Sequence, residues 1–270
     1  DMASPERGAA IDLFRLNAED QPMTFKPKFI SFDCYGTLID WEFGITETVS
    51  GLAAAHGVHP TEIEILSQFA SHETHVQDAN PTWTYPVILA ETWRRMATSM
   101  SLPDSLTHPA QCERDAQAFA SSVPNWPAFD DSHEALLDLQ RQCKLVILSN
   151  VDNESFAGSN KRLDITFDAV LTAQDIGSYK PDLNNFHVLL QRASDMGVPL
   201  HQHLHVAQSL FHDHVPAQAV GLKTVWINRY GAKRAAAGSV GATPTATAVT
   251  PHWEFASLRA FADAMLAIRS

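Results

Sequence analysis

The residue of this chain best suited to covalent chemistry is Asp33, which closes the apolar run of the segment FISFDCYGTLID. A β-branched and aromatic run that ends in a glycine turn predicts a buried parallel strand over residues 29–32. Asp33 would then stand at the carboxyl edge of the sheet, where open α/β sheets bind their ligands. A carboxylate held there can act as a nucleophile and form an ester or acyl intermediate.

Further strands are needed to hold such a residue, and apolar runs predict them over residues 145–148, 169–171, 203–207 and 223–227. Strands that alternate with helices of this length indicate right-handed crossovers and a parallel sheet, hence an α/β fold. Polar side chains follow three of these strands and would meet Asp33 at the same edge. They are Ser149 with Asn150, Lys180, and Asp213.

The segment between the first two strands has helical periodicity throughout, broken by His-Pro, Asn-Pro and Leu-Pro-Asp. Helices are predicted over 46–56, 61–79, 86–100 and 110–121. We therefore expect an all-helical subdomain inserted into a core, with 235–250 as a flexible surface segment and 253–268 as a closing helix. The predicted domains are an extension at 1–27, a core at 28–44 and 121–270, and a helical subdomain at 45–120.

Four segments, in this order along the chain, resemble the signatures of the haloacid dehalogenase (HAD) superfamily: FDCYGT, LVILSN, SYKPD and HVAQSLFHDHV. The helical insert resembles the cap of that superfamily. The resemblance implies a Rossmann-like core with a helical cap after the first strand. Phosphatases of the superfamily carry acids where this chain has Tyr35 and Gln208. With a reference pKa of about 10, a tyrosine cannot replace a general acid near neutral pH. The replacements resemble the L-2-haloacid dehalogenase branch.

That resemblance implies a metal-independent hydrolase, without a cofactor, that acts on a small-molecule 2-halocarboxylic acid. Asp33 would displace the halide and form an aspartyl ester, Lys180 would keep Asp33 ionised, and Asp213 would hold the hydrolytic water. The catalytic residues implied are Asp33, Lys180, Asp213, Ser149 and Asn150. The substrate-binding residues implied are Cys34, Tyr35, Ser149, Asn150, Ser209 and His212.

One expected residue is missing. L-2-haloacid dehalogenases carry an arginine in the first long cap helix, beside the departing halide, but residues 62–78 contain neither arginine nor lysine. His72 and His75 are the potential cations there, and Arg94 and Arg95 further along either replace the arginine or face solvent. A magnesium-dependent phosphatase and a non-catalytic HAD relative therefore remain as alternatives.

Composition narrows the remaining properties. The chain has 270 residues, enough for a core with an inserted subdomain, and its net charge of −12 argues against nucleic acid or anionic membrane partners. Cys34, Cys112 and Cys143 are odd in number and scattered, which indicates reduced thiols and a cytoplasmic protein. The histidines of 201–214 lack a metal-site spacing, but His212 and His214 flank Asp213 and are candidates to orient it. Related enzymes are often dimers, so a homodimer is expected from the resemblance.

Overall fold

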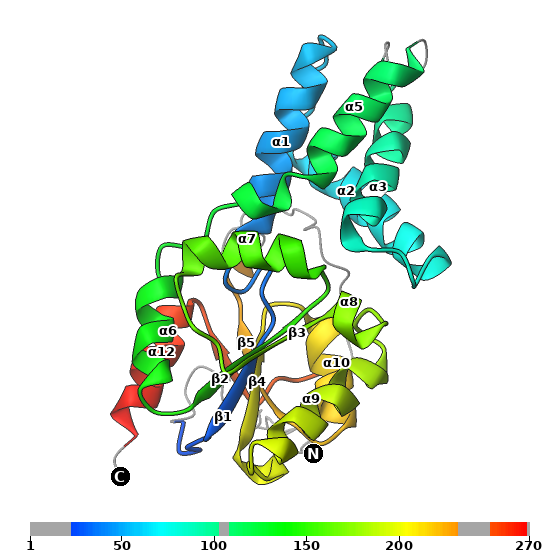
Figure 1. Ribbon diagram of the computed structural model, residues 1–270. Coiled ribbons are helices and arrows are strands. Elements are labelled where there is room, and N and C mark those ends of the chain that lie inside the picture. The colour runs from blue at the N-terminus through cyan, green and yellow to red at the C-terminus, as the bar shows by residue number, and fades with distance from the viewer. Residues whose placement is uncertain (1–22, 103–107, 232–248, 269–270) are drawn as a thin grey trace, which may run out of the picture.

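The computed structural model describes residues 23–102, 108–231 and 249–268, and its centre is a parallel six-stranded sheet (Figure 1). The strands lie in the order β3-β2-β1-β4-β5-β6. The predicted Rossmann-like α/β fold is confirmed. The strands are β1 (Phe29–Phe32), β2 (Lys144–Ser149), β3 (Ala169–Thr172), β4 (His203–Ala207), β5 (Lys223–Ile227) and β6 (Trp253–Phe255).

Helices cover both faces of the sheet, with α6, α7 and α12 on one face and α8, α9 and α10 on the other (Figure 1). Alternate residues of β1 enter the two layers: Ile30 and Phe32 pack with the first set, and Phe29 packs with the second. A central strand buried on both faces has to be apolar throughout. The helices are α6 (Ser132–Gln140), α7 (Asn153–Leu163), α8 (Ala173–Ile176), α9 (Leu183–Asp195), α10 (Val215–Ala219) and α12 (Leu258–Ala267).

Among the described residues, the cap contains the helices α1 (Trp41–Ala55), α2 (Glu62–Ala79), α3 (Tyr85–Ser99) and α5 (Pro109–Ala120), all between β1 and β2 as expected. Buried aromatic rings hold it together, with Phe119 lying 6.3 Å from Phe69 and 6.2 Å from Trp93 between centroids. Helix α1 begins at Trp41, before the predicted boundary at residue 45. It begins there because the Asp40 side chain accepts a hydrogen bond from the Phe43 amide and caps the helix.

The structure changes the predictions of an extension over residues 1–27 and of a closing helix over residues 253–268. Residues 1–22 and 232–248 lie outside the described part, but residues 23–27 pack on the core, where the Phe25 ring stacks on Trp253. The helix predicted over 253–268 is instead strand β6 followed by α12, which Ser257 caps. A three-residue strand has no periodicity to distinguish it from a helix; its pairing with β5 defines it. Within the described residues, no helix has the length and apolar character needed to cross a membrane.

The turn that follows β1 requires a glycine. Gly36 has a φ of +90°, and the amides of Leu38 and Ile39 both donate to the Cys34 carbonyl at 2.7 and 3.0 Å. A Cβ at position 36 would lie 3.1 Å from both Gln208 Oε1 and Trp41 Nε1. Glycine therefore fits both the backbone conformation and the close approach of the core to the start of the cap.

We expect Gly36→Ala to lower the free energy of unfolding by about 2–3 kcal/mol, since it combines a positive φ with overpacking. Gly57→Ala is the matched control, because Gly57 has a φ of +73° but a methyl group added there would meet no atom within 4 Å. It should cost about 1 kcal/mol, for backbone strain alone. Urea unfolding of both variants measures the difference, and equal losses would contradict the packing argument.

Candidate active site

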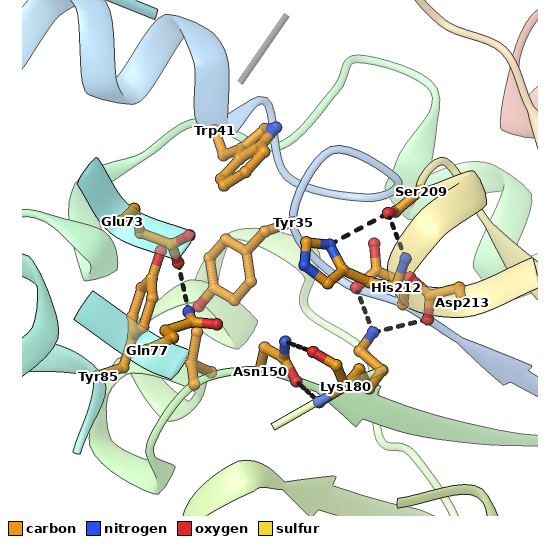
Figure 2. Close-up of a pocket in the computed structure, with 12 residues that line it drawn as sticks. Tyr35, Trp41, Glu73, Gln77, Tyr85, Asn150, Lys180, Ser209, His212 and Asp213 are labelled. Carbon is orange, nitrogen blue, oxygen red and sulfur yellow. Dashed lines mark hydrogen bonds and ion pairs between the residues drawn. The ribbon is translucent and has the colours of Figure 1, made fainter. Parts of the chain in front are cut away.

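The site lies at the carboxyl edge of the sheet, where the strand order reverses between β1 and β4. Asp33 follows β1, and Asp213 lies on the short π-helical turn η4 (Leu210–His214) that follows β4. An open cavity of about 50 Å³ separates this edge from the cap. Its core side includes Asp33, Tyr35, Asn150, Lys180, Ser209, His212 and Asp213, and its cap side includes Trp41, Glu73, Gln77 and Tyr85 (Figure 2).

The side chain of Lys180 joins the two carboxylates. Its Nζ donates to Asp33 Oδ1 at 2.9 Å, to Asp213 Oδ1 at 2.7 Å and to the Leu148 carbonyl at 3.0 Å. All three donors of the ammonium are therefore used inside the protein. Burial alone would lower the pKa of Lys180, but the charges of Asp213 and Asp33 outweigh it and raise that pKa. Lys180 thus stays protonated.

Asp33 is oriented by two donors, Lys180 Nζ at Oδ1 and Thr37 Oγ1 at Oδ2. Its Oδ2 accepts from Thr37 Oγ1 at 2.8 Å, and the Thr37 oxygen in turn accepts from the Gln208 amide at 2.9 Å. Burial and the charge of Asp213 raise the pKa of Asp33 above its ordinary value, against the opposing effect of Lys180. A desolvated carboxylate of raised pKa is a stronger nucleophile than one in water. Thr37 was not among the residues predicted from the sequence, although it stands in the same turn.

Asp213 is held from below the sheet edge. Its Oδ1 lies 3.0 Å from His205 Nε2, the His205 Nδ1 lies 2.8 Å from Ser31 Oγ, and that hydroxyl also contacts His203 at 3.0 Å. Burial alone would raise the pKa of Asp213, but Lys180 and His205 hold it well below its usual range. The other oxygen, Oδ2, has no hydrogen-bond partner among the described residues.

The histidines that flank Asp213 in sequence do not orient it in this arrangement. His212 lines the cavity, with its Nδ1 3.2 Å from Ser209 Oγ, and burial lowers the pKa of His212 to about 4. His214 Nε2 lies 3.0 Å from the carbonyl of Ala207. His205 takes the expected role because alternate residues of β4 point to the layer beneath Asp213.

Asn150 lines the cavity and also binds the backbone of Lys180. The Lys180 amide donates to Asn150 Oδ1 at 2.7 Å, and Asn150 Nδ2 donates to the Lys180 carbonyl at 3.0 Å. This pair of bonds fixes the loop that carries the ammonium. Asn150 is thus first a positioning residue for Lys180.

Two predicted residues lie behind the cavity wall, and the structure corrects their placement. Cys34 is fully buried among core side chains, because successive residues after β1 point to opposite sides, and burial raises the pKa of its thiol. Ser149 is also buried and does not line the cavity; its Oγ has no partner among the described residues.

The cap side of the cavity contains no arginine, lysine or histidine among the described lining residues. Arg94 binds Glu113 at 2.7 Å and Arg95 binds Glu91 at 3.0 Å on the outer cap. His72 contacts Ser99 there, at 2.9 Å, and none of the three replaces the missing arginine. Glu73 occupies the cap side instead, and its place in the buried stripe of α2 is the sequence signal that could have identified it.

Together these features define a capped α/β protein with a carboxylate–lysine–carboxylate site at the switch point of a parallel sheet. A family model described as haloacid dehalogenase-like hydrolase matches residues 27–206. The chain belongs to this family of hydrolases. A comparison with curated proteins gives no match.

Solved structures share the fold at low sequence identity. The defluorinating L-2-haloacid dehalogenase Rha0230 has a TM-score of 0.70 at 18% identity, covering 90% of this chain and 100% of that one. The L-2-haloacid dehalogenase from Xanthobacter autotrophicus has a TM-score of 0.70 at 17% identity, with 90% and 100% covered. The HAD-hydrolase YfnB from Bacillus subtilis, bound to magnesium, has a TM-score of 0.69 at 15% identity, with 89% and 99% covered.

The residues of this chain do not fit a magnesium ion at the same edge. Hard divalent cations require several oxygen ligands and negative charge. Here Asp33 and Asp213 both bind the Lys180 ammonium, and Gln208 adds no charge. In the described ranges, no group of three or more histidine, cysteine, aspartate or glutamate side chains is arranged to hold a metal.

We expect Lys180→Met to lower the free energy of unfolding by about 3–5 kcal/mol near neutral pH, since two buried carboxylates lose their counter-charge. Without the ammonium, the pKa of both carboxyls rises in the folded state. The penalty is therefore absent below the ordinary carboxyl pKa and reaches full size as pH rises through the raised pKa.

Urea unfolding at about pH 5 and about pH 8 measures this effect. Lys144→Met is the matched control, because Lys144 makes an exposed ion pair with Asp168 at 3.1 Å and should cost less than about 1 kcal/mol. Equal losses in the two variants would contradict the buried-cluster argument.

Proposed function

We propose that this protein is a 2-haloacid dehalogenase-like hydrolase that uses Asp33 as a covalent nucleophile and needs no metal. The observation that carries the proposal is the position of the Lys180 ammonium, within 2.9 Å of Asp33 and 2.7 Å of Asp213. An ammonium there favours the ionised form of Asp33 and neutralises part of the negative charge that a divalent cation would require.

In the first step, a carboxylate oxygen of Asp33 attacks C2 of a small 2-halocarboxylic acid. The new C–O bond forms as the C–halogen bond breaks, and the halide leaves with the bonding electrons on the opposite face. An aspartyl ester results, which divides one difficult displacement into two easier steps.

In the second step, a water molecule attacks the ester carbonyl of Asp33. Asp213, which Lys180 and His205 hold ionised, is the proposed acceptor of the proton of that water. The bond that breaks is the acyl C–O bond of Asp33, and the C2–O bond is kept. The tetrahedral intermediate expels the 2-hydroxy acid, and Asp33 returns as a carboxylate. The product has the inverted configuration, since only the first step involves C2.

The chemistry of Tyr35 favours a halide over an alkoxide leaving group. Burial raises the pKa of Tyr35 well above 10, and its hydroxyl makes a 2.8 Å hydrogen bond with Ser159. It therefore does not supply a proton to a departing oxygen near neutral pH. A halide leaves as a stable anion and does not need that proton, whereas phosphate-ester cleavage benefits from a general acid.

Asn150, Ser209 and His212 line the core side of the cavity and are the proposed contacts for the substrate carboxylate. The three Lys180 donors are already used, and His212 is neutral because burial lowers its pKa to about 4. Recognition of the carboxylate would then rest on neutral hydrogen-bond donors at this edge.

We expect halide release from L-2-chloropropionate and L-2-bromopropionate in the presence of EDTA, faster for bromide, the better leaving group. Asp33→Asn should reduce turnover by about 10³-fold or more while the protein stays folded. Asp195→Asn, at an exposed aspartate of α9, is the control and should keep the wild-type rate.

A single turnover in water labelled with the heavy oxygen isotope tests the intermediate directly. The label should enter the Asp33 carboxylate, found by mass spectrometry of its peptide, and not the first molecule of product. Magnesium-dependent phosphate release from p-nitrophenyl phosphate without halide release would overturn the proposal in favour of a phosphatase. Neither activity would favour a non-catalytic relative.

A further inference from the structure

Glu73 is a buried acid on a largely apolar stripe of the cap. The buried residues of α2 recur at helical spacing, including Ile65, Phe69 and Val76, and Glu73 belongs to the same stripe with 7% of its surface exposed. It lines the cavity that contains Asp33. Figure 2 shows Glu73 and Gln77 on one side of the Tyr35 ring, with Lys180 on the other.

One carboxyl oxygen of Glu73 accepts a hydrogen bond from the protein, and the other is available to bind a ligand. Gln77 Nε2 donates a hydrogen bond to Glu73 Oε1, and Glu73 Oε2 has no hydrogen-bond partner among the described residues. Burial and the nearby charge of Asp78 raise the pKa of Glu73 to about 8, against the effect of Gln77. At neutral pH the side chain is a carboxylic acid that accepts through Oε1, so its proton on Oε2 can be donated into the cavity.

The direction of the displacement brings the leaving group to this side. The attacking oxygen, C2 and the halogen must lie nearly in line, and Asp33 attacks from the sheet edge. The halide is therefore expelled away from the sheet, toward the cap. The described cap residues that line the cavity are Trp41, Glu73, Gln77 and Tyr85, none of them a cation.

We propose that Glu73 stabilises the leaving group of this enzyme. Its neutral carboxyl donates a hydrogen bond to the halide expelled by Asp33. This inference rests on the proposed function and deepens it. No proton is transferred: the halide keeps the bonding electrons and departs as a hydrogen-bonded anion, and Glu73 keeps its proton. The residue takes the place of a cation and favours small halides, which accept the stronger hydrogen bonds.

The sign of the pH dependence follows from the groups around Glu73. Asp78 lies near it on α2, Tyr85 on α3, Tyr35 on the core loop and Tyr179 on the loop before Lys180. The core edge beyond carries Asp33, Lys180, His212 and Asp213. Burial raises the pKa of all three tyrosines well above 10, and the pKa of Lys180 is also raised, so these groups keep their protons. His212 is already neutral, and Asp33 must be ionised to attack.

Ionisation of Glu73 therefore accounts for a loss of activity on the alkaline side, and protonation of Asp33 accounts for a loss on the acid side. Turnover should fall as pH rises through about 8, by about tenfold per pH unit. The anionic Glu73 loses its donor and repels both the substrate and the departing halide.

The test is the pH profile of halide release, corrected for uncatalysed release, in wild type, Glu73→Gln and Glu73→Leu. Glutamine keeps a donor without a titrating proton, so it should retain activity near pH 7 within about tenfold and lose the alkaline decline. Leucine fits the apolar stripe but donates nothing. It should lower kcat by about 10- to 100-fold, with a larger loss for chloride than for bromide.

Glu47→Gln, at an exposed position of α1, controls for removal of an acid from the cap and should leave the profile unchanged. Asp78→Asn removes the charge that raises the pKa of Glu73 and should move the alkaline decline to lower pH. An unchanged decline in Glu73→Gln, with halide still released, would overturn the role of Glu73 alone. No halide release by the wild type would overturn the proposed function and this inference together.

Discussion

The structure depends on one buried ammonium that lies between two buried carboxylates. Removing three charged groups from water costs free energy, and this arrangement is stable only because every donor of Lys180 Nζ has an acceptor. Two carboxylates and one ammonium leave the cluster one negative charge in excess. Since Lys180 and His205 hold Asp213 ionised, the excess charge raises the pKa of Asp33, the group that must donate electrons.

The topology of the sheet makes this cluster possible. Asp33 and Lys180 are 147 positions apart in sequence, and both reach the same edge because parallel strands all end there. Local bonds then set the side chains: Gly36 turns the chain after β1, Thr37 binds one oxygen of Asp33, and Asn150 binds the backbone of Lys180. Each of these residues helps to position the Asp33–Lys180 ion pair, whose two partners come from different elements.

The sequence was sufficient for the parts of the protein that repeat a simple period or end a strand. The parallel sheet, the helical insert, and the meeting of Asp33, Lys180 and Asp213 follow from alternation and strand ends. It was not sufficient where a role depends on a contact between distant segments. His205 reaches Asp213 from within a strand, and β6 is a strand only because it pairs with β5.

The core and the cap contribute different kinds of side chain to the cavity. Among the described lining residues, the ion pairs of Lys180 with Asp33 and Asp213 lie at the sheet edge of the core. The described cap lining consists of aromatic rings, an amide and a buried acid. An anionic substrate in this acidic protein gains little from long-range attraction, because the net charge is −12 and the Lys180 charge is already neutralised. Selection of the proposed substrate must therefore come from short-range contacts: donors at the edge, and the fit of the group on C2 against Trp41 and Tyr85.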